Sequence, residues 1–482
     1  MAGTLPFTLD APGLLHEASL LHGNWVQAKS GERFDVEDPG SGQVFASCPT
    51  NTVADVDAYI CSAHRSFLSY RETNPRARAK MLLNWHNLIV QSKNDIAKLV
   101  VYETGKPMAE AVGEVEYALG FAWWFASEAE RVRGSIGQPS ISERRTFVIK
   151  QPIGVCVALV RWNFPVAMII RKAAAALAAG CTIVIKPSPE TPLSVLALAD
   201  LALQAGFAPG VINILTTDNA NTPGVSEALC KHPLVRKVTD GLKNVTLELG
   251  GNCRFIIFDD GDLEQALAAL MILKWRTAGQ ACTHANRVYV QSGVYDTFLR
   301  MIVNATKQLK VGHGANPGTT MGPLTTSRGL EKLERHVADA LAKGGRLELG
   351  GRRLQLQGNY FQPTIISGMS ADMLTTQEEI FGPLLNLYRF ETEEEAVHMA
   401  NDTSMGLASY FFTRDVSRTW RLLENLEAGM IGMNTGNSSA AESPFGGIKA
   451  SGYGKEAGKD VAIEEYLITK TGTLTVGTLS KL

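Results

Sequence analysis

The sequence lacks the features that mark several protein classes. It has seven cysteines in 482 residues and no CxxC pair, which argues against a zinc site or a redox dithiol and is typical of a reducing compartment. The longest apolar run, 173–185, is too short for a bilayer, and residues 1–10 do not resemble a secretory signal. A net charge of -2 gives no basic field. We therefore expect neither a membrane nor a nucleic-acid partner.

A GxGxxG fingerprint is also missing, although strands and helices are predicted to alternate. Apolar β-branched runs predict strands at 155–160, 182–185 and 211–215. Helices are expected between them at 167–179 and 192–203, the first ending at Gly180. This order predicts a parallel sheet with its ligand crevice at the carboxyl ends of the strands.

A second alternating region begins near Glu248, consistent with the two or three domains that the length suggests. Strands are predicted at 255–258, 287–290 and 385–390, and helices at 263–274 and 294–309. The stretch 466–476 is rich in Thr, Val and Leu and is expected to pair as an edge strand. The predicted fold class is therefore α/β.

Cys282 is the candidate nucleophile, because it follows Gly279 and Gln280 in a predicted loop. We expect Gly279 to let the backbone approach a substrate closely. A free thiol has a pKa of about 8.5, and a nearby cation or helix N-terminus would raise its thiolate fraction. The alternative is a buried, inert thiol, which we favour for the other six cysteines.

Three polar residues accompany this thiol. Asn163 can donate its amide to an oxyanion, and Glu248, before two glycines, can deprotonate a water. Lys186 can reach an adenosine ribose or a phosphate. The alternatives stay open: a turn residue for Asn163, a surface carboxylate for Glu248 and a solvated lysine for Lys186.

With these residues in view, the chain resembles the aldehyde dehydrogenase superfamily, and within it the succinate-semialdehyde dehydrogenases. The resemblance covers nearly the whole chain. It is carried by the motifs Trp-Asn-Phe-Pro at 162–165, Lys-Pro-Ser at 186–188, Leu-Glu-Leu-Gly-Gly-Asn at 247–252, Gly-Gln-Ala-Cys at 279–282, Glu-Ile-Phe-Gly-Pro at 379–383 and Pro-Phe-Gly-Gly-Ile-Lys-Ala-Ser-Gly at 444–452.

The resemblance implies two parallel-sheet α/β domains, one of them a Rossmann-like cofactor domain, and a β-arm that joins subunits into homodimers or homotetramers. We place the cofactor domain at 1–125 and 141–247, the catalytic domain at 248–445, and the arm at 126–140 and 460–482. Cys282 is implied as nucleophile, Glu248 as general base and Asn163 as oxyanion donor. The implied cofactor, NAD or NADP, is bound by Trp162, Lys186, Ser188, Glu379 and Phe381.

The resemblance also implies a substrate. Members that oxidise succinic semialdehyde bind its distal carboxylate with two arginines and a serine, which match Arg171, Arg276 and Ser439. The expected reaction is oxidation of an acidic aldehyde to an acid through a thiohemiacetal and a thioester on Cys282. A salt-bridged structural arginine is the alternative for Arg171 or Arg276 taken alone.

The chain departs from the family pattern near 239–242. Only Asp240 and Gly241 stand where the family has a Phe-Thr-Gly-Ser-Thr turn and a helix, so donors to the cofactor pyrophosphate are expected to be missing. Pro189 replaces a glutamate of NAD-preferring members, which permits NADP. His284 replaces a second cysteine, which excludes a disulfide with Cys282.

The tripeptide at 480–482, Ser-Lys-Leu, matches a peroxisomal address read by an import receptor. A peroxisomal enzyme could act on a biosynthetic aldehyde instead of succinic semialdehyde, and a cytoplasmic location is expected if the tripeptide is accidental. Two other hypotheses remain for the chain. The first is that the chain is a cofactor-impaired homologue, with ester hydrolysis at Cys282 or a non-catalytic role. The second is that its shortened segment reflects a mis-predicted splice junction.

Overall fold

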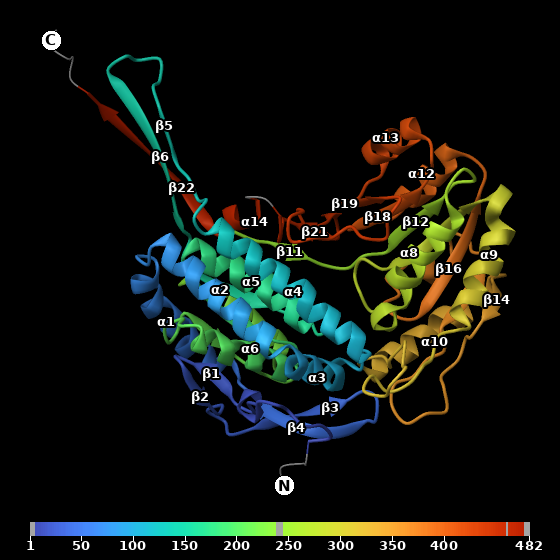
Figure 1. Ribbon diagram of the computed structural model, residues 1–482, viewed down its shortest axis with the longest axis horizontal. Helices are drawn as coiled ribbons and strands as arrows, with labels where there is room; N and C mark the ends of the chain where they lie inside the picture. Colours follow the sequence, from blue (N-terminus) through green and yellow to red (C-terminus); the bar gives the residue numbers. More distant parts are fainter. Residues whose placement is uncertain (1–4, 238–243, 459–460, 477–482) are drawn as a thin grey trace.

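Two mainly parallel sheets covered by helices form the two halves of the molecule, and a three-stranded arm projects from the first (Figure 1). The computed structural model describes residues 5–237, 244–458 and 461–476. The predicted α/β class with two parallel sheets and an arm is confirmed.

The first sheet has the strand order β10-β7-β8-β9-β1-β2. The pairs β10–β7, β7–β8 and β8–β9 are parallel, whereas β1 pairs antiparallel with β9 and β2. The strands are β1 (Ser19–Leu21), β2 (Asn24–Val26), β7 (Val155–Leu159), β8 (Thr182–Lys186), β9 (Ile212–Ile214) and β10 (Val235–Lys237). Every residue of β8 is buried, as a continuous apolar run between two helix layers requires.

Helices cover both faces of this sheet. Helices α1 and α7 pack on one face, and α5 and α6 pack on the other, where α2 and α4 form a further layer. These helices are α1 (Val53–Tyr70), α2 (Pro75–Gln91), α3 (Lys93–Thr104), α4 (Met108–Glu128), α5 (Pro165–Ala179), α6 (Leu193–Gln204) and α7 (Thr222–Lys231). The predicted helix end at Gly180 is confirmed by its left-handed φ of 96°. The first turn η1 (Pro12–Leu14) and the hairpin β3 (Arg33–Asp38) and β4 (Gln43–Pro49) precede α1.

The second sheet has the order β14-β15-β16-β13-β12-β18-β19, parallel except for the antiparallel pair β14–β15. Its strands are β12 (Cys253–Ile257), β13 (Ala285–Gln291), β14 (Arg346–Leu349), β15 (Thr364–Ser367), β16 (Leu384–Phe390), β18 (Ala408–Phe412) and β19 (Met430–Met433). Its helical segments are α8 (Leu263–Trp275), η2 (Arg276–Gly279), α9 (Ser292–Thr306), α10 (Ser327–Ala342), α11 (Leu374–Gln377), α12 (Glu393–Asn401) and α13 (Val416–Asn425).

Two short ladders bring the C-terminal part of the chain back to the centre of the molecule. β11 (Leu247–Glu248) pairs with β21 (Gly452–Tyr453), and β17 (Met405–Gly406) pairs with β20 (Ile448–Lys449). The first ladder places Glu248 directly opposite Gly452. The segment that carries Glu248 is therefore paired with the C-terminal part of the chain.

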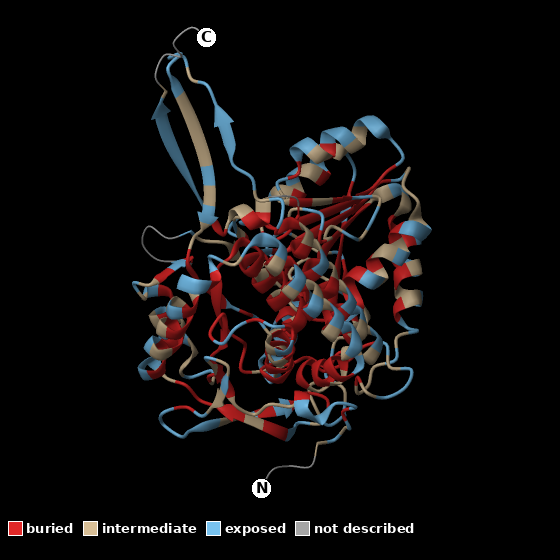
Figure 2. Cartoon of the chain, turned by 60° about the vertical axis from the view of Figure 1, so that its left-hand side comes forward, coloured by how far each residue is buried: buried red, intermediate tan, exposed pale blue. Residues whose placement is uncertain are grey.

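The arm consists of β5 (Ser135–Gly137), β6 (Arg144–Pro152) and β22 (Leu467–Thr475), with α14 (Val461–Glu464) at its base. The predicted strand at 466–476 is present and pairs along all nine residues of β6. Our boundary at residue 140 therefore cuts through the arm, because β6 belongs to the same antiparallel sheet as β5 and β22. The arm is mostly exposed, whereas both large sheets are buried (Figure 2).

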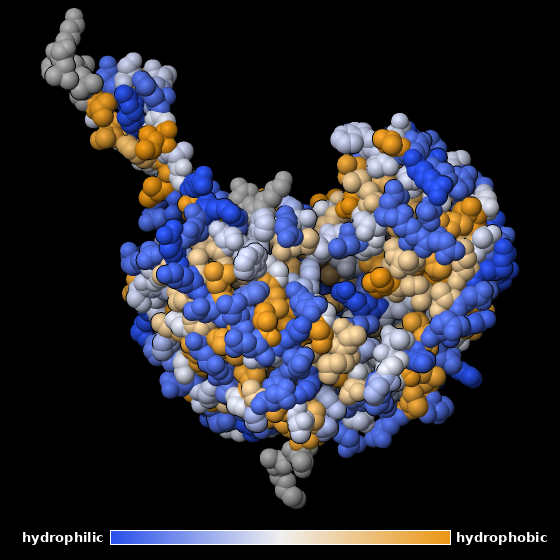
Figure 3. All heavy atoms as spheres, viewed as in Figure 1, coloured by the Kyte–Doolittle hydropathy of each residue, from blue (hydrophilic) through white to orange (hydrophobic). Residues whose placement is uncertain are grey.

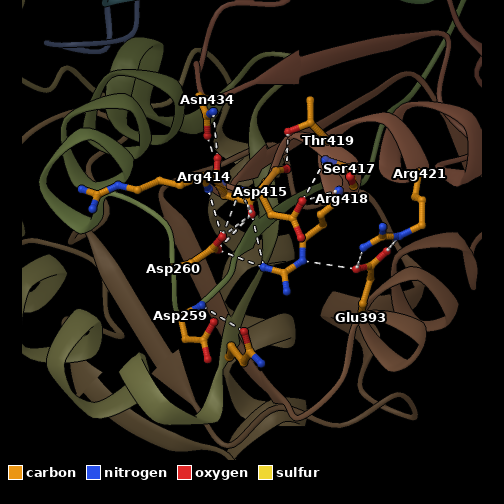
Figure 4. A network of polar contacts seen from close by, with 12 residues as sticks. Asp259, Asp260, Glu393, Arg414, Asp415, Ser417, Arg418, Thr419, Arg421 and Asn434 are labelled. Atoms are coloured by element: carbon orange, nitrogen blue, oxygen red, sulfur yellow. Dashed lines mark hydrogen bonds and ion pairs between the residues drawn. The ribbon is translucent and has the colours of Figure 1, made fainter.

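An ionic network ties α12 and α13 to the loop after β12 (Figure 4). Arg418 lies 2.9 Å from Asp260 and 3.2 Å from Glu393, and Arg421 lies 2.7 Å from Glu393. These carboxylates are neutralised by guanidinium groups. In the parts of the chain that the structure describes, no group of acidic, His or Cys side chains could hold a metal ion. No helix described there is long and apolar enough to cross a membrane.

Candidate active site

Two cavities meet at Glu248 and Asn163, between the two halves of the molecule. The first, of about 590 Å³, is lined by Cys282 and is called the thiol cavity below. The second, of about 720 Å³, is lined by Lys186 and is called the Lys186 cavity. Glu248 and Asn163 line both, so a molecule in either cavity reaches the same pair of side chains. The surface between the arm and the second half is hollowed (Figure 3).

Cys282 follows a strained turn at the end of α8. Thr277, Ala278 and Gly279 have φ of 52°, 50° and 75°, and left-handed backbone at a non-glycine residue costs roughly 1–3 kcal/mol. The Thr277 N–H donates to Glu110 Oε2 at 2.6 Å, which anchors the turn to α4. A Cβ at Gly279 would lie 2.1 Å from the Gly382 carbonyl oxygen. This contact requires a glycine at position 279, and the expected approach of its backbone to a substrate stays a prediction.

The Cys282 thiol donates to Glu248 Oε1 at 3.0 Å. Burial raises the pKa of the thiol well above its ordinary value, and the Glu248 carboxylate raises it further, against a smaller effect of Arg171. The expectation that a nearby cation favours the thiolate is therefore wrong for the resting site. The thiol is protonated, and the carboxylate that accepts its hydrogen bond is placed to take its proton.

Arg171, on α5, is the cation beside this pair. Its Nη2 lies 3.2 Å from Glu248 Oε2 and 2.7 Å from Glu456 Oε2, while Lys172 Nζ lies 2.9 Å from Glu456 Oε1. Burial opposes the charge on Arg171, but the two carboxylates outweigh it and raise its pKa. The guanidinium stacks on Phe445, at 4.0 Å from the ring centre. Arg171 is thus salt-bridged and also lines the thiol cavity, so both readings of this arginine describe part of its environment.

The other two predicted substrate residues line the same cavity. Arg276 begins the turn after α8, is exposed, and lies 5.3 Å from the centre of the Phe164 ring. The Ser439 hydroxyl forms a hydrogen bond with the Tyr117 hydroxyl. The structure therefore brings Arg171, Arg276 and Ser439 to one cavity with Cys282.

Asn163 is buried, and its Nδ2 donates to the Gln280 carbonyl oxygen at 3.1 Å. An amide nitrogen carries two hydrogens, so one remains for an oxyanion. The backbone carbonyl oxygen of Asn163 accepts from Lys106 Nζ at 2.9 Å, and Lys106 also pairs with Glu114. Glu114 in turn accepts from the Val166 N–H at 2.8 Å, at the start of α5. This contact chain fixes Asn163 in the bend directly before α5, so the turn-residue alternative describes its place in the chain, and the oxyanion role stays a prediction.

Sequence reasoning missed the residues that hold this centre together. Lys106 and Glu114 pair with both side chains buried, and Glu456 is buried against Arg171. A lone Lys, Glu or Arg in a sequence is normally read as a surface residue. A faint signal exists for Lys106, since it stands between Gly105 and Pro107 at the start of a helix, but nothing marks its partner.

Aromatic and acidic side chains line the Lys186 cavity near Glu248. The rings of Trp162 and Phe381 meet edge to face, with centres 5.4 Å apart. Glu379 Oε1 accepts from the Gly251 N–H at 2.9 Å, and burial raises the pKa of this carboxyl. All the predicted cofactor residues, including Ser188, line this cavity.

Lys186 lies at the carboxyl end of β8 and is 4% exposed, so the solvated-lysine alternative is wrong. Its Nζ donates to the Pro187 carbonyl at 3.0 Å, and burial lowers its pKa to about 8, against the opposing charge of Glu190. The Ser188 hydroxyl donates to Glu190. Arg328, another residue that sequence reasoning missed, lies 3.6 Å from Glu190 and lines the same cavity.

Asp240 and Gly241, which mark the departure from the family pattern, lie outside the described residues. The described residues that flank them lie side by side, because Lys237 forms a parallel bridge with Asn244. Lys237 Nζ donates to the Thr246 hydroxyl at 2.7 Å, and both residues line the Lys186 cavity. The expected loss of pyrophosphate donors stays a prediction.

Comparison with known proteins decides the family. The model of the aldehyde dehydrogenase family matches residues 25–472. The chain belongs to this family. It is 44% identical over 478 residues to succinate-semialdehyde dehydrogenase [NADP(+)] of Escherichia coli (strain K12), covering 96% of this chain and 98% of that one. The recognition made from the motifs is confirmed.

Two further relatives and one solved structure extend this result. Succinate-semialdehyde dehydrogenase [NADP(+)] of Saccharomyces cerevisiae is 43% identical over 489 residues, covering 98% of this chain and 97% of that one. The 3-sulfolactaldehyde dehydrogenase of Pseudomonas putida is 43% identical over 479 residues, covering 96% and 98%. The crystal structure of an E. coli NADP-dependent enzyme matches with a TM-score of 0.95 at 43% identity, covering 97% and 100%. The yeast alignment is longer than the 482 residues of this chain, so it contains gaps on this side.

Proposed function

We propose that this aldehyde dehydrogenase oxidises an aldehyde with an anionic group to the corresponding acid, through a thioester on Cys282. The contact that carries the proposal joins Cys282 Sγ to Glu248 Oε1 at 3.0 Å, in a cavity shared with Arg171, Arg276 and Ser439. A nucleophile and its base within hydrogen-bond distance are the arrangement that covalent catalysis needs.

The side chains carry out the acyl chemistry in a fixed order. Glu248 accepts the thiol proton, and Cys282 Sγ attacks the aldehyde carbon. The negative charge that develops on the aldehyde oxygen is met by the free amide hydrogen of Asn163, a type of contact worth roughly 2.7–4 kcal/mol. Glu248 returns the thiol proton to solvent, and the hydride of the adduct would pass to the nicotinamide as the thioester forms. Glu248 then takes a proton from the water that attacks the thioester, and Cys282 Sγ leaves as the acid is released.

The Lys186 cavity suits a nicotinamide dinucleotide, NAD or NADP. Its volume of about 720 Å³ falls in the range of cofactor sites. Trp162, Phe381 and Glu379 would hold the end near Cys282, and Lys186 and Ser188 would hold the other end. The nicotinamide, when bound, supplies the hydride acceptor. Lys186 and Arg328 are two cations on one wall, which supports the additional phosphate of NADP.

The thiol cavity supports an acidic substrate. Arg276 is exposed to it, and the Nε of Arg171 has no hydrogen-bond partner among the described residues. The names of the relatives agree with this charge preference, because succinic semialdehyde and 3-sulfolactaldehyde both carry an anionic group. We propose succinic semialdehyde, or another acidic aldehyde of similar length, as the substrate.

The arm and the tail support two further proposals. Ile136, Ile149 and Leu474 on the arm are 74%, 50% and 50% exposed, which supports burial of this surface in a homodimer or homotetramer. The tripeptide at 480–482 lies outside the described residues, and its sequence supports recognition by the peroxisomal import receptor. Light scattering would test the first proposal and imaging of a tagged tail variant the second.

The Glu248→Gln variant tests the mechanism. Its turnover should fall by roughly 10²–10⁴-fold without a burst of reduced nicotinamide, because Gln can take neither the thiol proton nor the proton of the attacking water. Wild-type enzyme should turn over continuously with an acidic aldehyde and NAD or NADP. No reduced nicotinamide with either cofactor and any acidic or neutral aldehyde would reject the proposal.

The shortened segment near Asp240 favours one alternative, a homologue that hydrolyses esters at Cys282 without a dinucleotide. It predicts no heat of binding with NAD or NADP in calorimetry, together with ester turnover that disappears in Cys282→Ala. Turnover that survives this substitution would exclude the alternative. Sequencing the transcript would decide whether the segment is shortened in the natural protein.

A further inference from the structure

His284 is a polar side chain of the thiol cavity to which the acyl chemistry gives no role. It lies two residues after Cys282, is 3% exposed and lines the cavity wall. Its backbone N–H donates to the Ala281 carbonyl at 3.1 Å, so the ring is held close to the nucleophile loop. The charges of Lys274, Arg276 and Lys106 act on the ring.

The imidazole is neutral in this setting. Burial lowers the pKa of His284 well below its ordinary value, and the three cations lower it further, against one contact with the Gly279 backbone that raises it. A neutral imidazole has one nitrogen that donates a hydrogen bond and one that accepts. The Gly279 carbonyl can satisfy the donor alone.

The accepting nitrogen is therefore unpaired. In the part of the chain that the structure describes, His284 Nδ1 is buried without a hydrogen-bond partner. Lys274, the adjacent cation, directs its Nζ to Asn286 Oδ1 at 2.9 Å. The hydroxyls of Ser439 and Ser438 in the same cavity bond to Tyr117 and Tyr410. A buried acceptor left unpaired is unfavourable, so a ligand that donates a hydrogen bond to it is favoured over one that does not.

We propose that His284 selects aldehydes that carry a hydroxyl group between the carbonyl carbon and the anionic group. The substrate hydroxyl donates to the neutral ring while the anionic group lies at the neighbouring Arg276. This inference rests on the proposed function and narrows its substrate class from acidic aldehydes to hydroxylated acidic aldehydes. His284 acts here on specificity and takes no part in the acyl chemistry.

The selectivity of three proteins tests the proposal. kcat/KM is measured for succinic semialdehyde and for its 2-hydroxy and 3-hydroxy derivatives with wild-type enzyme, His284→Leu and His284→Asn. Wild type should prefer one hydroxylated substrate by about tenfold or more. Leu fills a similar volume without an acceptor and should abolish the preference, whereas Asn keeps an acceptor and should retain at least a third of it. Ser438→Ala removes a hydroxyl already paired with Tyr410 and should leave the preference unchanged.

The result that overturns the proposal is a wild type that does not discriminate, or a Leu variant that discriminates as well as wild type. Failure of the proposed function looks different, because wild type would then oxidise none of the three aldehydes. In that case, protection of Cys282 from alkylation by iodoacetamide still tests the role of His284. Malate should protect wild type at about tenfold lower concentration than succinate, and His284→Leu should remove the difference. Equal protection by the two diacids in wild type rejects the role of His284.

Discussion

The thiol cavity and the Lys186 cavity share a wall but differ in how their charges are neutralised. In the thiol cavity Arg171 is bound by Glu248 and Glu456, which come from separate parts of the chain. In the Lys186 cavity the lysine donates to the backbone carbonyl beside it and lies 3.4 Å from the Thr222 hydroxyl. Arg171 has two carboxylate partners within the protein, whereas Lys186 has no ion pair among the described residues and leaves a cation for an anion to bind. The attack of Cys282 and the hydrolysis of the thioester therefore depend less on a bound dinucleotide than the hydride transfer does.

The Cys282→Ser variant tests the thiol cavity most strongly. Turnover with aldehyde and cofactor should fall by roughly 10⁴-fold or more, because a hydroxyl is a far weaker nucleophile than a thiol at this site. Calorimetry should detect the same affinity for NAD or NADP as in wild type. A comparable loss of cofactor affinity would show that the two cavities are not separable.

Arg171 and Arg276 are a matched pair, one buried in ion pairs and one exposed. Arg171→Gln should lower the free energy of unfolding by about 3–5 kcal/mol, because two carboxylates lose their buried partner. Arg276→Gln should change it by less than about 0.5 kcal/mol while raising the KM for an acidic aldehyde. Thermal unfolding at fixed protein concentration and steady-state kinetics measure the two effects. Equal unfolding midpoints for the variants would contradict this contrast.

Asn163→Ala should lower kcat by roughly 10²–10³-fold, the usual effect of losing one oxyanion donor. The KM for aldehyde should change much less, since the missing contact forms as the carbonyl is attacked. Asn163→Asp, of the same shape, should be at least as impaired, because a carboxylate repels the developing charge. A change confined to KM would assign Asn163 to substrate binding.

Glu110 gives a pH dependence with a defined sign. Burial raises its carboxyl pKa to about 7 from its ordinary 4.5, so the stability it contributes is complete below about 4.5 and is lost as the pH rises through 7. Glu110→Gln resembles the protonated form and keeps an acceptor for the Thr277 N–H. Urea unfolding should find the variant more stable than wild type by about 1–3 kcal/mol near pH 8 and equal near pH 4.5. A lower stability of the variant at both pH values would mean that the charge itself is required.

Lys186→Ala tests the second cavity with the smallest expected effect. The KM for the cofactor should rise about tenfold through loss of one charged contact, while the rate at which iodoacetamide alkylates Cys282 should stay within twofold. Lys93→Ala, which removes a lysine paired with Glu116 on the outer surface, serves as the control. If alkylation slows together with cofactor binding, Lys186 also shapes the thiol cavity.

The elements around the site could be predicted from sequence where each has its own local pattern. The buried strand β8, the helix α5 with its end at Gly180, and the loops that carry Asn163 and Cys282 are of this kind. The partners of the site residues could not. Lys106 and Glu114 lie eight residues apart, but nothing in the sequence marks them as a buried pair, and Arg171 and Glu456 join distant segments. The state of the Cys282 thiol was missed for the same reason. Its pKa depends on burial and on a carboxylate 34 residues away.

The assignment of β6 failed for a related reason. Its residues are half-buried or exposed, and nothing in them indicates that their partner lies at the far end of the chain. Pairing between segments separated by more than 300 residues leaves no local signature. The substrate preference could not be predicted from a local pattern either, because the charges that act on His284 belong to Lys274, Arg276 and Lys106.

The contact between Lys106 and Glu114 has a consequence for how this protein can change over generations. Lys106 contacts both Glu114 and the backbone of Asn163, and each buried charge of the pair compensates the other. Replacing either one leaves an unpaired buried charge, at a cost of about 3–5 kcal/mol that is a large part of the stability margin of many proteins. Mutational drift through either single change is therefore disfavoured. The pair restrains the positions around it from diverging, whatever aldehyde the enzyme is selected to use.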